Sequence, residues 1–390
     1  MEISLTKRYA LAFIVLLGIV SLFSDMTYEG ARSINGAYLA ILGANAAVVG
    51  FVAGFGEFIG FGLRFISGYF TERTQRYWLI TIIGYAVNLF AVPLLAIAHH
   101  WWAAACFIVL ERFGKAIRVP ARDAMLAHAS QNVGMGWGFG LHQALDQTGA
   151  MLGPLLVAAM LYYQGNNYRA GFVILLIPAL LALTTLSIAY RRYPNPHQLA
   201  VKKLSVDFHI QQHAFKYFLI GAAFVAAGYA DFPLMAYHFE KTNLLQPLWI
   251  PVTYGLAMGI GALTAPLLGR LYDRFGLWIL MSAIVATAWF APFVFWGNKQ
   301  LAWLGVGLWA VGMGVQDSLL RSIVGNLIPA PKRPSAYGLF NLIYGACWFI
   351  GSVLLGLLYD HSLKILVYVS LALQFASLPC FLISAKKLLG

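Results

Sequence analysis

The sequence is poor in charged residues for its length. Only 10% of its 390 residues are Asp, Glu, Lys or Arg, whereas 61% are hydrophobic. A soluble domain carries about 25% charged residues, so a soluble fold of this size could not cover its surface with so few. The composition therefore predicts an integral membrane protein, because long apolar segments are stable in lipid.

Cysteine is also scarce. The three cysteines, Cys106, Cys347 and Cys380, lie far apart within apolar runs. Such spacing indicates neither a disulfide framework nor a metal site, and we expect no metal and no cofactor. We expect no cleavable signal peptide either, because the apolar run after Lys7 and Arg8 is too long and lacks a small-residue cleavage site.

Catalytic signatures are missing too. The sequence contains no P-loop, no H-E-x-x-H and no G-x-S-x-G. The stretch GFGEFIG at residues 54–60 imitates a dinucleotide-binding fingerprint, but it sits inside an apolar segment with no strand before it. Close helix packing through small residues explains it better. We therefore do not expect an enzyme.

Long apolar segments dominate what remains, and a helix needs roughly 20 apolar residues to cross a bilayer. They predict an all-α protein of twelve membrane spans. The longest polar stretch separates spans six and seven, so we expect two six-helix bundles, residues 1–192 and 216–390, joined by a linker at 193–215. The expected spans are residues 9–38, 45–70, 77–98, 101–126, 135–163, 168–190, 216–238, 248–270, 277–297, 301–327, 336–359 and 363–385.

The net charge of +12 follows from the predicted orientation of the chain in the membrane. Most loop Lys and Arg residues fall on one side of the predicted membrane, and only Arg169, Lys241, Lys299 and Lys364 fall on the other. Positive loops stay in the cytoplasm, so both termini and the linker are expected there. We expect a bacterial inner membrane protein and no nucleic-acid partner.

The two halves repeat each other at a shift of about 200 residues. At this shift Gly68 falls on Gly269, Glu72 on Asp273 and Arg73 on Arg274. Two parallel six-helix repeats around a central cavity are a transporter architecture, with the binding site near the middle of the membrane.

These residues carry a resemblance to the major facilitator superfamily over essentially the whole chain. The superfamily has the loop signature G-x-x-x-D-R-x-G-R/K after span two and a weaker copy after span eight. Here Glu72 and Gln75 replace the acid and the second glycine of the first copy, whereas the second copy keeps Gly276. The resemblance implies a conformational latch; the alternative is that these arginines only enforce topology. The implied latch residues are Gly68, Glu72, Arg73, Arg76, Gly269, Asp273 and Arg274.

Two further motifs resemble the superfamily in part. Arg112 matches the arginine of the R-x-x-Q-G motif in proton-coupled branches, but Lys115 replaces the glutamine. Gly149-x-x-x-Gly153-Pro154 matches the start of the exporter signature, whose closing glycines are missing. The alternative for this second motif is close helix packing with a proline kink.

Ionisable residues at membrane depth are costly and are tolerated where they face a cavity or a partner. The stretch SDMTYEGARS at residues 24–33 therefore predicts the outer end of a cavity-lining helix, not a loop. A carboxylate beside a movable arginine can take up and release a proton; the alternative is a static ion-pair network. The expected proton-coupling residues are Asp25, Glu29, Arg32, Glu57, Glu111 and Arg112.

Most of these charges lie in the first half, so we expect that half to hold ions and polar solute and the second to supply an aromatic wall. His142 and Asp146 are four residues apart and face together, which suits either a proton relay or a structural hydrogen bond. The expected substrate-binding residues are Tyr28, Lys115, Arg118, His142, Gln143, Asp146, Tyr229, Gln316, Asp317, Arg321, Asn341, Tyr344 and Trp348.

The sequence thus predicts a secondary transporter that moves a small organic solute by alternating access. We expect coupling to protons, a monomer in the lipid bilayer, and efflux if the partial exporter signature sets the direction. The alternatives are an importer of an anionic metabolite or siderophore and, more remotely, a channel or a membrane receptor that does not transport. The sequence does not choose between Asp25 and Glu29 as the proton carrier.

Overall fold

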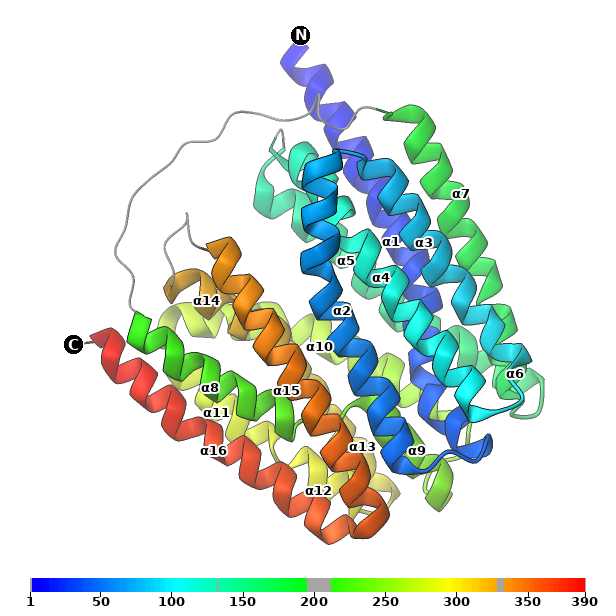
Figure 1. Ribbon diagram of the computed structural model, residues 1–390, viewed down its shortest axis with the longest axis vertical. Helices are drawn as coiled ribbons and strands as arrows, with labels where there is room; N and C mark the ends of the chain where they lie inside the picture. The colour runs from blue at the N-terminus through cyan, green and yellow to red at the C-terminus, as the bar shows by residue number, and fades with distance from the viewer. Residues whose placement is uncertain (1, 132, 195–211, 328–332, 390) are drawn as a thin grey trace. The chain divides into compact units, whose positions relative to one another are not determined.

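The computed structural model describes residues 2–131, 133–194, 212–327 and 333–389. These residues form helices joined by short loops and contain no strand (Figure 1). The helices of the first half are α1 (Glu2–Ile41), α2 (Ala46–Thr74), α3 (Tyr77–Leu94) with η1 (Leu95–Ile97), α4 (Trp101–Ser130), α5 (Met135–Tyr163), α6 (Tyr168–Ile174) and α7 (Leu176–Arg192). Those of the second half are α8 (Gln212–Gly228), α9 (Phe232–Thr242), α10 (Trp249–Phe275), α11 (Leu277–Thr287), α12 (Phe290–Phe295), α13 (Lys299–Val315), η3 (Gln316–Leu320), α14 (Arg321–Leu327), α15 (Arg333–His361) and α16 (Leu363–Leu389).

Ten described helical segments are long and apolar enough to cross a membrane. The remaining two predicted spans are α4, which carries six charged residues, and 299–327, where the helix is interrupted by the π-helical turn η3. The polar stretch 24–33 is helical throughout, as predicted, because its side chains are mostly buried against neighbouring helices and need not interrupt the backbone hydrogen bonds.

The chain divides into two compact units. Unit 1 comprises Met1–Ile34 and Ile59–Leu204, and unit 2 comprises Asn35–Phe58 and Ser205–Gly390. The division runs through α1 and α2, so the end of α1 and the start of α2 pack with the second half of the chain. The predicted linker, residues 193–215, lies largely outside the described residues.

In unit 1, α3 and α4 lie side by side because glycines remove the side chains between them (Figure 1). Gly84 rests against the backbone of Arg118, and Gly114 rests against the backbone of Asn88. A side chain at either glycine would collide with backbone atoms of the partner helix. This close approach buries the polar side chains that α3 and α4 share.

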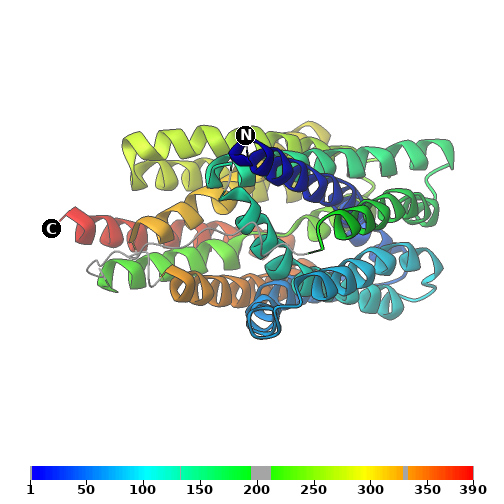
Figure 2. The same ribbon diagram turned by 90° about the horizontal axis from the view of Figure 1, so that it is seen from above.

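In unit 2, α8 and α16 lie side by side in both views (Figures 1 and 2). Hydroxyl groups of α16 bond to the backbone of α8: Ser370 Oγ donates to the Gly228 carbonyl at 2.7 Å, and Ser384 Oγ donates to the Ala214 carbonyl at 2.9 Å. Between α8 and α9 the seventh predicted span is broken over residues 229–231. Two carbonyl groups at this break accept hydrogen bonds from other helices of the unit: Gly228 from Ser370 of α16, and Ala230 from Trp309 of α13.

Candidate functional site

Three cationic side chains converge on Tyr28 of α1, which is almost completely buried. Arg112 of α4 donates to the Tyr28 hydroxyl, and Arg32 donates to the same oxygen at 3.1 Å. The Lys115 ammonium lies 3.5 Å from the centroid of the Tyr28 ring, within the range of a cation–π interaction. The phenol thus ties the charges of α4 to α1.

Arg118 lies next along α4 and is completely buried. Its guanidinium stacks on the Tyr85 ring, with 4.2 Å between Cζ and the ring centroid. Its Nη2 atom donates to Ser24 Oγ at 3.0 Å and lies 3.8 Å from Asp25 Oδ1. Its Nε and Nη1 atoms have no hydrogen-bond partner among the residues that the structure describes. Arg118 therefore retains unused donor capacity at the junction of α1, α3 and α4.

Glu111 turns toward α3 instead. The Asn88 amide donates to the Glu111 carbonyl at 3.0 Å and also to its carboxylate. Arg112 Nε completes the arrangement, 3.5 Å from Glu111 Oε2. All three side chains are buried, and Asn88 is the polar partner that makes a carboxylate tolerable at this depth.

A second branch of the network reaches α5. Ser21 donates to the Asp146 carboxylate, and Arg122 donates to Ser21 at 3.2 Å while pairing with Asp123 at 2.7 Å. His142 is buried one turn before Asp146, and its Nε2 atom has no hydrogen-bond partner within the described part of the chain. The hydrogen bond to the Asp146 carboxylate thus comes from a serine of α1.

Two glycines of α5 allow α1 to pack closely beside it and fix which residues of α1 they contact. Gly149 and Gly153 rest against the backbone of Leu22 and Met26, where a Cβ atom would collide with a carbonyl group. The Gly149-x-x-x-Gly153 motif therefore has a packing function here, whatever it contributes to the direction of transport. Because Asp25 lies between the two contact points, the same glycines position its carboxylate.

The other predicted residues of the first half are more scattered. Glu29 is buried on α1, Gln143 is exposed, and Glu57 lies in the part of α2 that belongs to unit 2. The structure therefore gathers most of the predicted charged residues of unit 1 around Tyr28 and Arg118.

The predicted aromatic residues of the second half gather within unit 2. Tyr229 lies 6.0 Å from Trp348 and Tyr344 lies 5.8 Å from it, between ring centroids. Tyr229 donates to the Trp309 carbonyl, and Tyr344 donates to Gln316. Asn341 is half-buried on the same helix as Tyr344 and Trp348.

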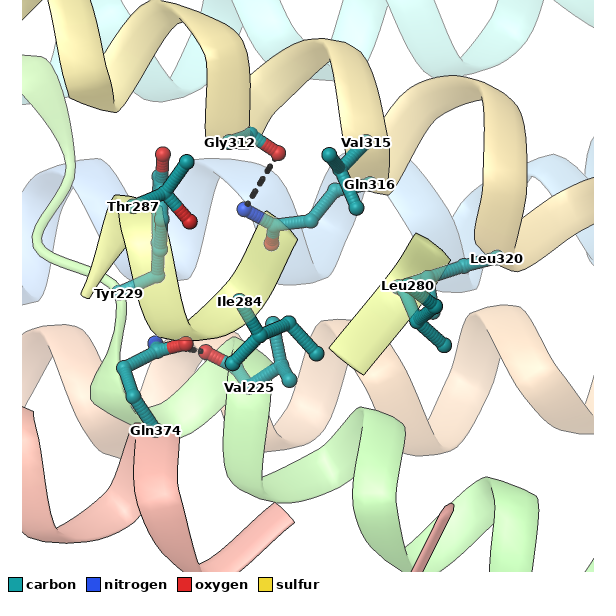
Figure 3. A pocket seen from close by; sticks show the side chains of 10 residues that line it. All are labelled: Val225, Tyr229, Leu280, Ile284, Thr287, Gly312, Val315, Gln316, Leu320 and Gln374. Carbon is teal, nitrogen blue, oxygen red and sulfur yellow. Dashed lines mark hydrogen bonds between the residues drawn. The ribbon is translucent and has the colours of Figure 1, made fainter. Parts of the chain in front are cut away.

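A small cavity adjoins these residues (Figure 3). Its volume is about 10 Å³, with Tyr229, Gln316 and Gln374 among its polar lining residues. Roughly 10–15 Å³ is what one water molecule needs, so this cavity alone is too small for an organic solute. The side chains of Asp317 and Arg321, predicted at this end of unit 2, lie outside the described residues.

The two predicted latch loops share a backbone feature. Gln75 has φ 56°, and Gly276 at the corresponding position of the repeat has φ 60°. Both turns therefore need a positive φ, which glycine adopts most easily, and the first copy imposes it on a glutamine.

The latch side chains themselves are only partly described. Glu72, Arg73 and Arg76 are exposed, and Arg73 donates to the Tyr69 hydroxyl at 3.3 Å. Gly68 and Gly269 are half-buried and Arg274 is exposed, whereas the side chain of Asp273 lies outside the described residues.

Sequence reasoning missed the broken seventh span. Asp231 caps α9 by accepting from the Phe232 backbone at 2.8 Å, and Trp309 Nε1 donates to the freed Ala230 carbonyl at 3.0 Å. The signal was present, since an Asp followed within two residues by Pro233 is typical of a helix start. Discontinuous helices often form solute sites in transporters.

Comparison with known proteins decides the family. The sequence model of the Major Facilitator Superfamily matches residues 14–384. The chain belongs to the Major Facilitator Superfamily. Its all-α fold with twelve predicted spans is the fold of this superfamily, and the chain is accordingly a transporter and not an enzyme.

Relatives of known sequence span most of this chain. An uncharacterized protein of Mycobacterium tuberculosis is 39% identical over 372 residues, which are 94% of this chain and 91% of that protein. An uncharacterized MFS-type transporter of Methanocaldococcus jannaschii is 26% identical over 370 residues (90% and 89%). The fosmidomycin resistance protein of Escherichia coli is 25% identical over 329 residues (78% and 76%).

Solved structures share the fold at low sequence identity. The nucleoside transporter NupG superposes with a TM-score of 0.75 at 15% identity, covering 95% of this chain and 99% of that one. The peptide transporter POT in complex with sulfate gives a TM-score of 0.73 at 14% identity, covering 96% and 94%. At this identity the two structures establish the superfamily fold and nothing about the solute.

Proposed function

We propose that this chain is a proton-coupled secondary transporter of a small organic solute, and that the charged cluster around Tyr28 and Arg118 is its coupling site. The observation that carries the proposal is the burial of Asp25, Glu29 and Glu111 at membrane depth beside arginines of α1 and α4. Groups of this kind are costly in lipid and are retained where they move ions or solutes.

The coupling follows from the way these charges are shared between helices. Asp25 sits on α1 and its partner Arg118 sits on α4, so a small displacement of one helix relative to the other changes the field at the carboxylate. A carboxylate that loses a cationic neighbour binds a proton more readily, and one that regains it releases the proton. A solute that disturbs the pair is thereby linked to proton movement.

Two directions of transport have support. Export is favoured by the partial signature Gly149-x-x-x-Gly153-Pro154 and by the resistance recorded in the name of the Escherichia coli relative. Import of an anionic metabolite is the second candidate, favoured by the basic side chains that Arg112, Lys115 and Arg118 bring to the cluster.

We also propose which parts of the chain move during transport and how the chain is oriented in the membrane. The bundles of residues 1–192 and 216–390 move against each other, with the loops 68–76 and 269–276 as latches and both termini in the cytoplasm of a bacterial cell. We expect the monomer to be the transporting unit.

Cysteine labelling tests the predicted orientation. Single cysteines replace Lys7 and Lys364 and are treated with an impermeant maleimide, first in intact cells and then in lysed cells. Only the cysteine at position 364 should react before lysis.

Transport in proteoliposomes tests the function itself. Purified protein is reconstituted and assayed for uptake and release of labelled metabolites and drugs, with and without a pH gradient. We expect Asp25→Asn or Glu29→Gln to abolish pH-driven transport, whereas Arg169→Gln, on the opposite side of the predicted membrane from the linker, should not. Wild-type rates in both carboxylate variants would exclude the coupling site, and the absence of any solute movement would exclude the transporter.

A further inference from the structure

The charged cluster of unit 1 is balanced in charge. It joins five cationic side chains and five carboxylates through the contacts described above, with Glu29 near enough to Lys115 to act on its charge, so its formal charge is zero when all of them are ionised. The cations are Arg32, Arg112, Lys115, Arg118 and Arg122, and the carboxylates are Asp25, Glu29, Glu111, Asp123 and Asp146. A neutral cluster attracts neither an anion nor a cation by net charge alone, so an ionic solute has to exchange with a charge already present.

Arg118 is a member of the cluster with hydrogen-bond donors left for such an exchange. It is completely buried, and two of its three guanidinium nitrogens, Nε and Nη1, have no acceptor among the described residues. Its contact with Asp25 is long, at 3.8 Å, and its hydrogen bond goes to the neutral hydroxyl of Ser24. Guanidinium N–H groups bind carboxylate, phosphate and sulfonate oxygens, so the unused Nε and Nη1 donors of Arg118 suit an anionic group.

Asp25 is the carboxylate that an incoming anion would displace. The charged groups that face it are Glu29 on its own helix, Lys115 and Arg118 on α4, and Asp146 on α5. When Arg118 turns to another anion, Lys115 is the one cation left among these four neighbours, facing Asp25 together with two negative groups. A buried carboxylate with too little positive charge beside it is disfavoured and is neutralised by a proton.

Glu111 does not share this position. Its carboxylate is held by Asn88 of α3 and by Arg112 of its own helix, and neither contact involves Arg118. An anion on Arg118 therefore leaves the partners of Glu111 in place.

We propose that the cluster binds a small organic anion together with one proton: the anion takes the guanidinium of Arg118, and the displaced carboxylate of Asp25 takes the proton from the aqueous side. The proposal rests on the proposed function, namely that solute and proton meet at this cluster. The balance is simple, since one negative charge enters on the anion and one leaves when Asp25 is protonated. The total charge of the cluster is therefore the same with both ligands bound as with neither, and the only covalent bond formed in the protein is the O–H bond of Asp25.

The direction of coupling follows from this exchange. Because the anion and the proton bind together, each raises the affinity for the other, and they cross the membrane in the same direction. Export by proton exchange would need the opposite, a solute that competes with the proton for Asp25. The inference therefore favours the second candidate of the proposed function, import of an anion with a proton.

Binding experiments on the purified full-length protein test the inference. The probes are lactate, benzoate and benzenesulfonate, which stay ionised at neutral pH, with lactamide, benzamide and choline as neutral and cationic controls. We expect at least one anion, and none of the controls, to bind. The dissociation constant should rise by up to about tenfold per pH unit above the pH at which free Asp25 ionises, because one proton is taken up per anion. A pH-indicator dye in weak buffer should record that uptake on mixing.

Variants locate the two ligands. Asp25→Asn should bind the anion with an affinity independent of pH, Arg118→Gln should lose anion binding, and Arg169→Gln should behave as wild type. Thermal unfolding without ligand checks that each variant is folded, and the dye measurement on wild type stands even if Asp25→Asn is not.

Several results would overturn the inference. They are binding of none of the anions, proton release on binding, and an unchanged pH dependence in folded Asp25→Asn. Transport of a neutral or cationic solute in the proteoliposome assay would also overturn it while leaving the proposed function intact, whereas no transport at all would remove the proposed function first.

Discussion

The carboxylate of Asp360 joins the end of α15 to the start of α2, and we predict that removing it lets these two helices separate more easily. It lies in the last turn of α15 and accepts hydrogen bonds from the first two backbone amides of α2, from Ala46 at 3.1 Å and from Ala47 at 2.9 Å. A negative charge is unfavourable at the end of its own helix and favourable at the start of α2. Asp360 therefore acts on α2, as a cap supplied by a residue more than 300 positions away.

The helices are also closely packed beside this cap. Gly50 of α2 rests against the backbone of Ser352, and Gly356 of α15 rests against the backbone of Ala46. We expect the cap and these glycines to hold the α2 start on α15 in one state of the transport cycle, at the predicted outer face. Alternating access requires such a contact to separate in another state.

The energy of the cap sets the size of the effect. Removing a capping side chain costs about 0.5–2 kcal/mol, and the charge near a helix start contributes about 0.3–1 kcal/mol. Because Asp360 is exposed, we take about 2 kcal/mol for Asp360→Ala and about 1 kcal/mol for Asp360→Asn, which keeps one acceptor oxygen. These energies multiply the ratio of separated to packed molecules by about thirtyfold and fivefold.

Distance measurements between two spin labels detect the shift. Labels at Ile41 and Lys364, in a background without the three native cysteines, report the separation of this end of α1 and α2 from the start of α16 within unit 2. We expect a longer distance to gain population in the order wild type, Asp360→Asn, Asp360→Ala. Asn298→Ala is the matched control, since it removes the cap that accepts from Leu301 at the start of α13 without touching α2. Identical distance distributions in Asp360→Ala and Asn298→Ala would refute the reasoning.

Three further substitutions test the packing of the site. Tyr28→Phe removes the buried oxygen that accepts from both Arg32 and Arg112, so we expect a loss of about 1–3 kcal/mol in chemical unfolding, whereas an unchanged midpoint would contradict this role. Gly149→Val forces a side chain into the backbone of α1, so we expect a loss of at least about 1–3 kcal/mol and a lower transport rate; a thermal midpoint equal to wild type would show that α1 can move aside. Trp309→Phe removes the donor to the Ala230 carbonyl at the broken span, so we expect about 1–3 kcal/mol less stability and faster amide exchange at residues 229–231, and wild-type exchange would show that water replaces the indole.

The sequence alone was sufficient for most of the helices and for the places of the charged residues along α1 and α4. Helix was predictable at residues 24–33 because the flanking runs are apolar and because Asp25, Glu29 and Arg32 recur at helical spacing. The shared helix face of Lys115 and Arg118 on α4 was predictable from their spacing of three residues. Family membership was predictable from the loop signature, although the first copy carries Gln75 where glycine is usual.

Partner choice within the cluster was not predictable. Spacing places Glu111 on one face with Lys115 and Arg118, yet its carboxylate bonds to Asn88 of α3. A single Asn in an apolar span gives no sign of its partner, because pairing depends on how closely α3 and α4 approach. That approach is set by Gly84 and Gly114, whose role as contact points appears only when both helices are in place.

The contrast between Glu111 and Asp25 bears on which carboxylate carries the proton. Sequence reasoning did not choose between Asp25 and Glu29, and it placed Glu57 and Glu111 among the other coupling residues. In the structure Glu111 has a neutral amide donor beside it, so its charge is stabilised by a group that no ligand needs to displace. Asp25 depends on Lys115 and on a distant contact with Arg118, two of whose donors have no partner among the residues that the structure describes. A proton carrier must be stable in both protonation states and must feel the solute, and Asp25 meets the second condition through the same guanidinium that would bind an anion.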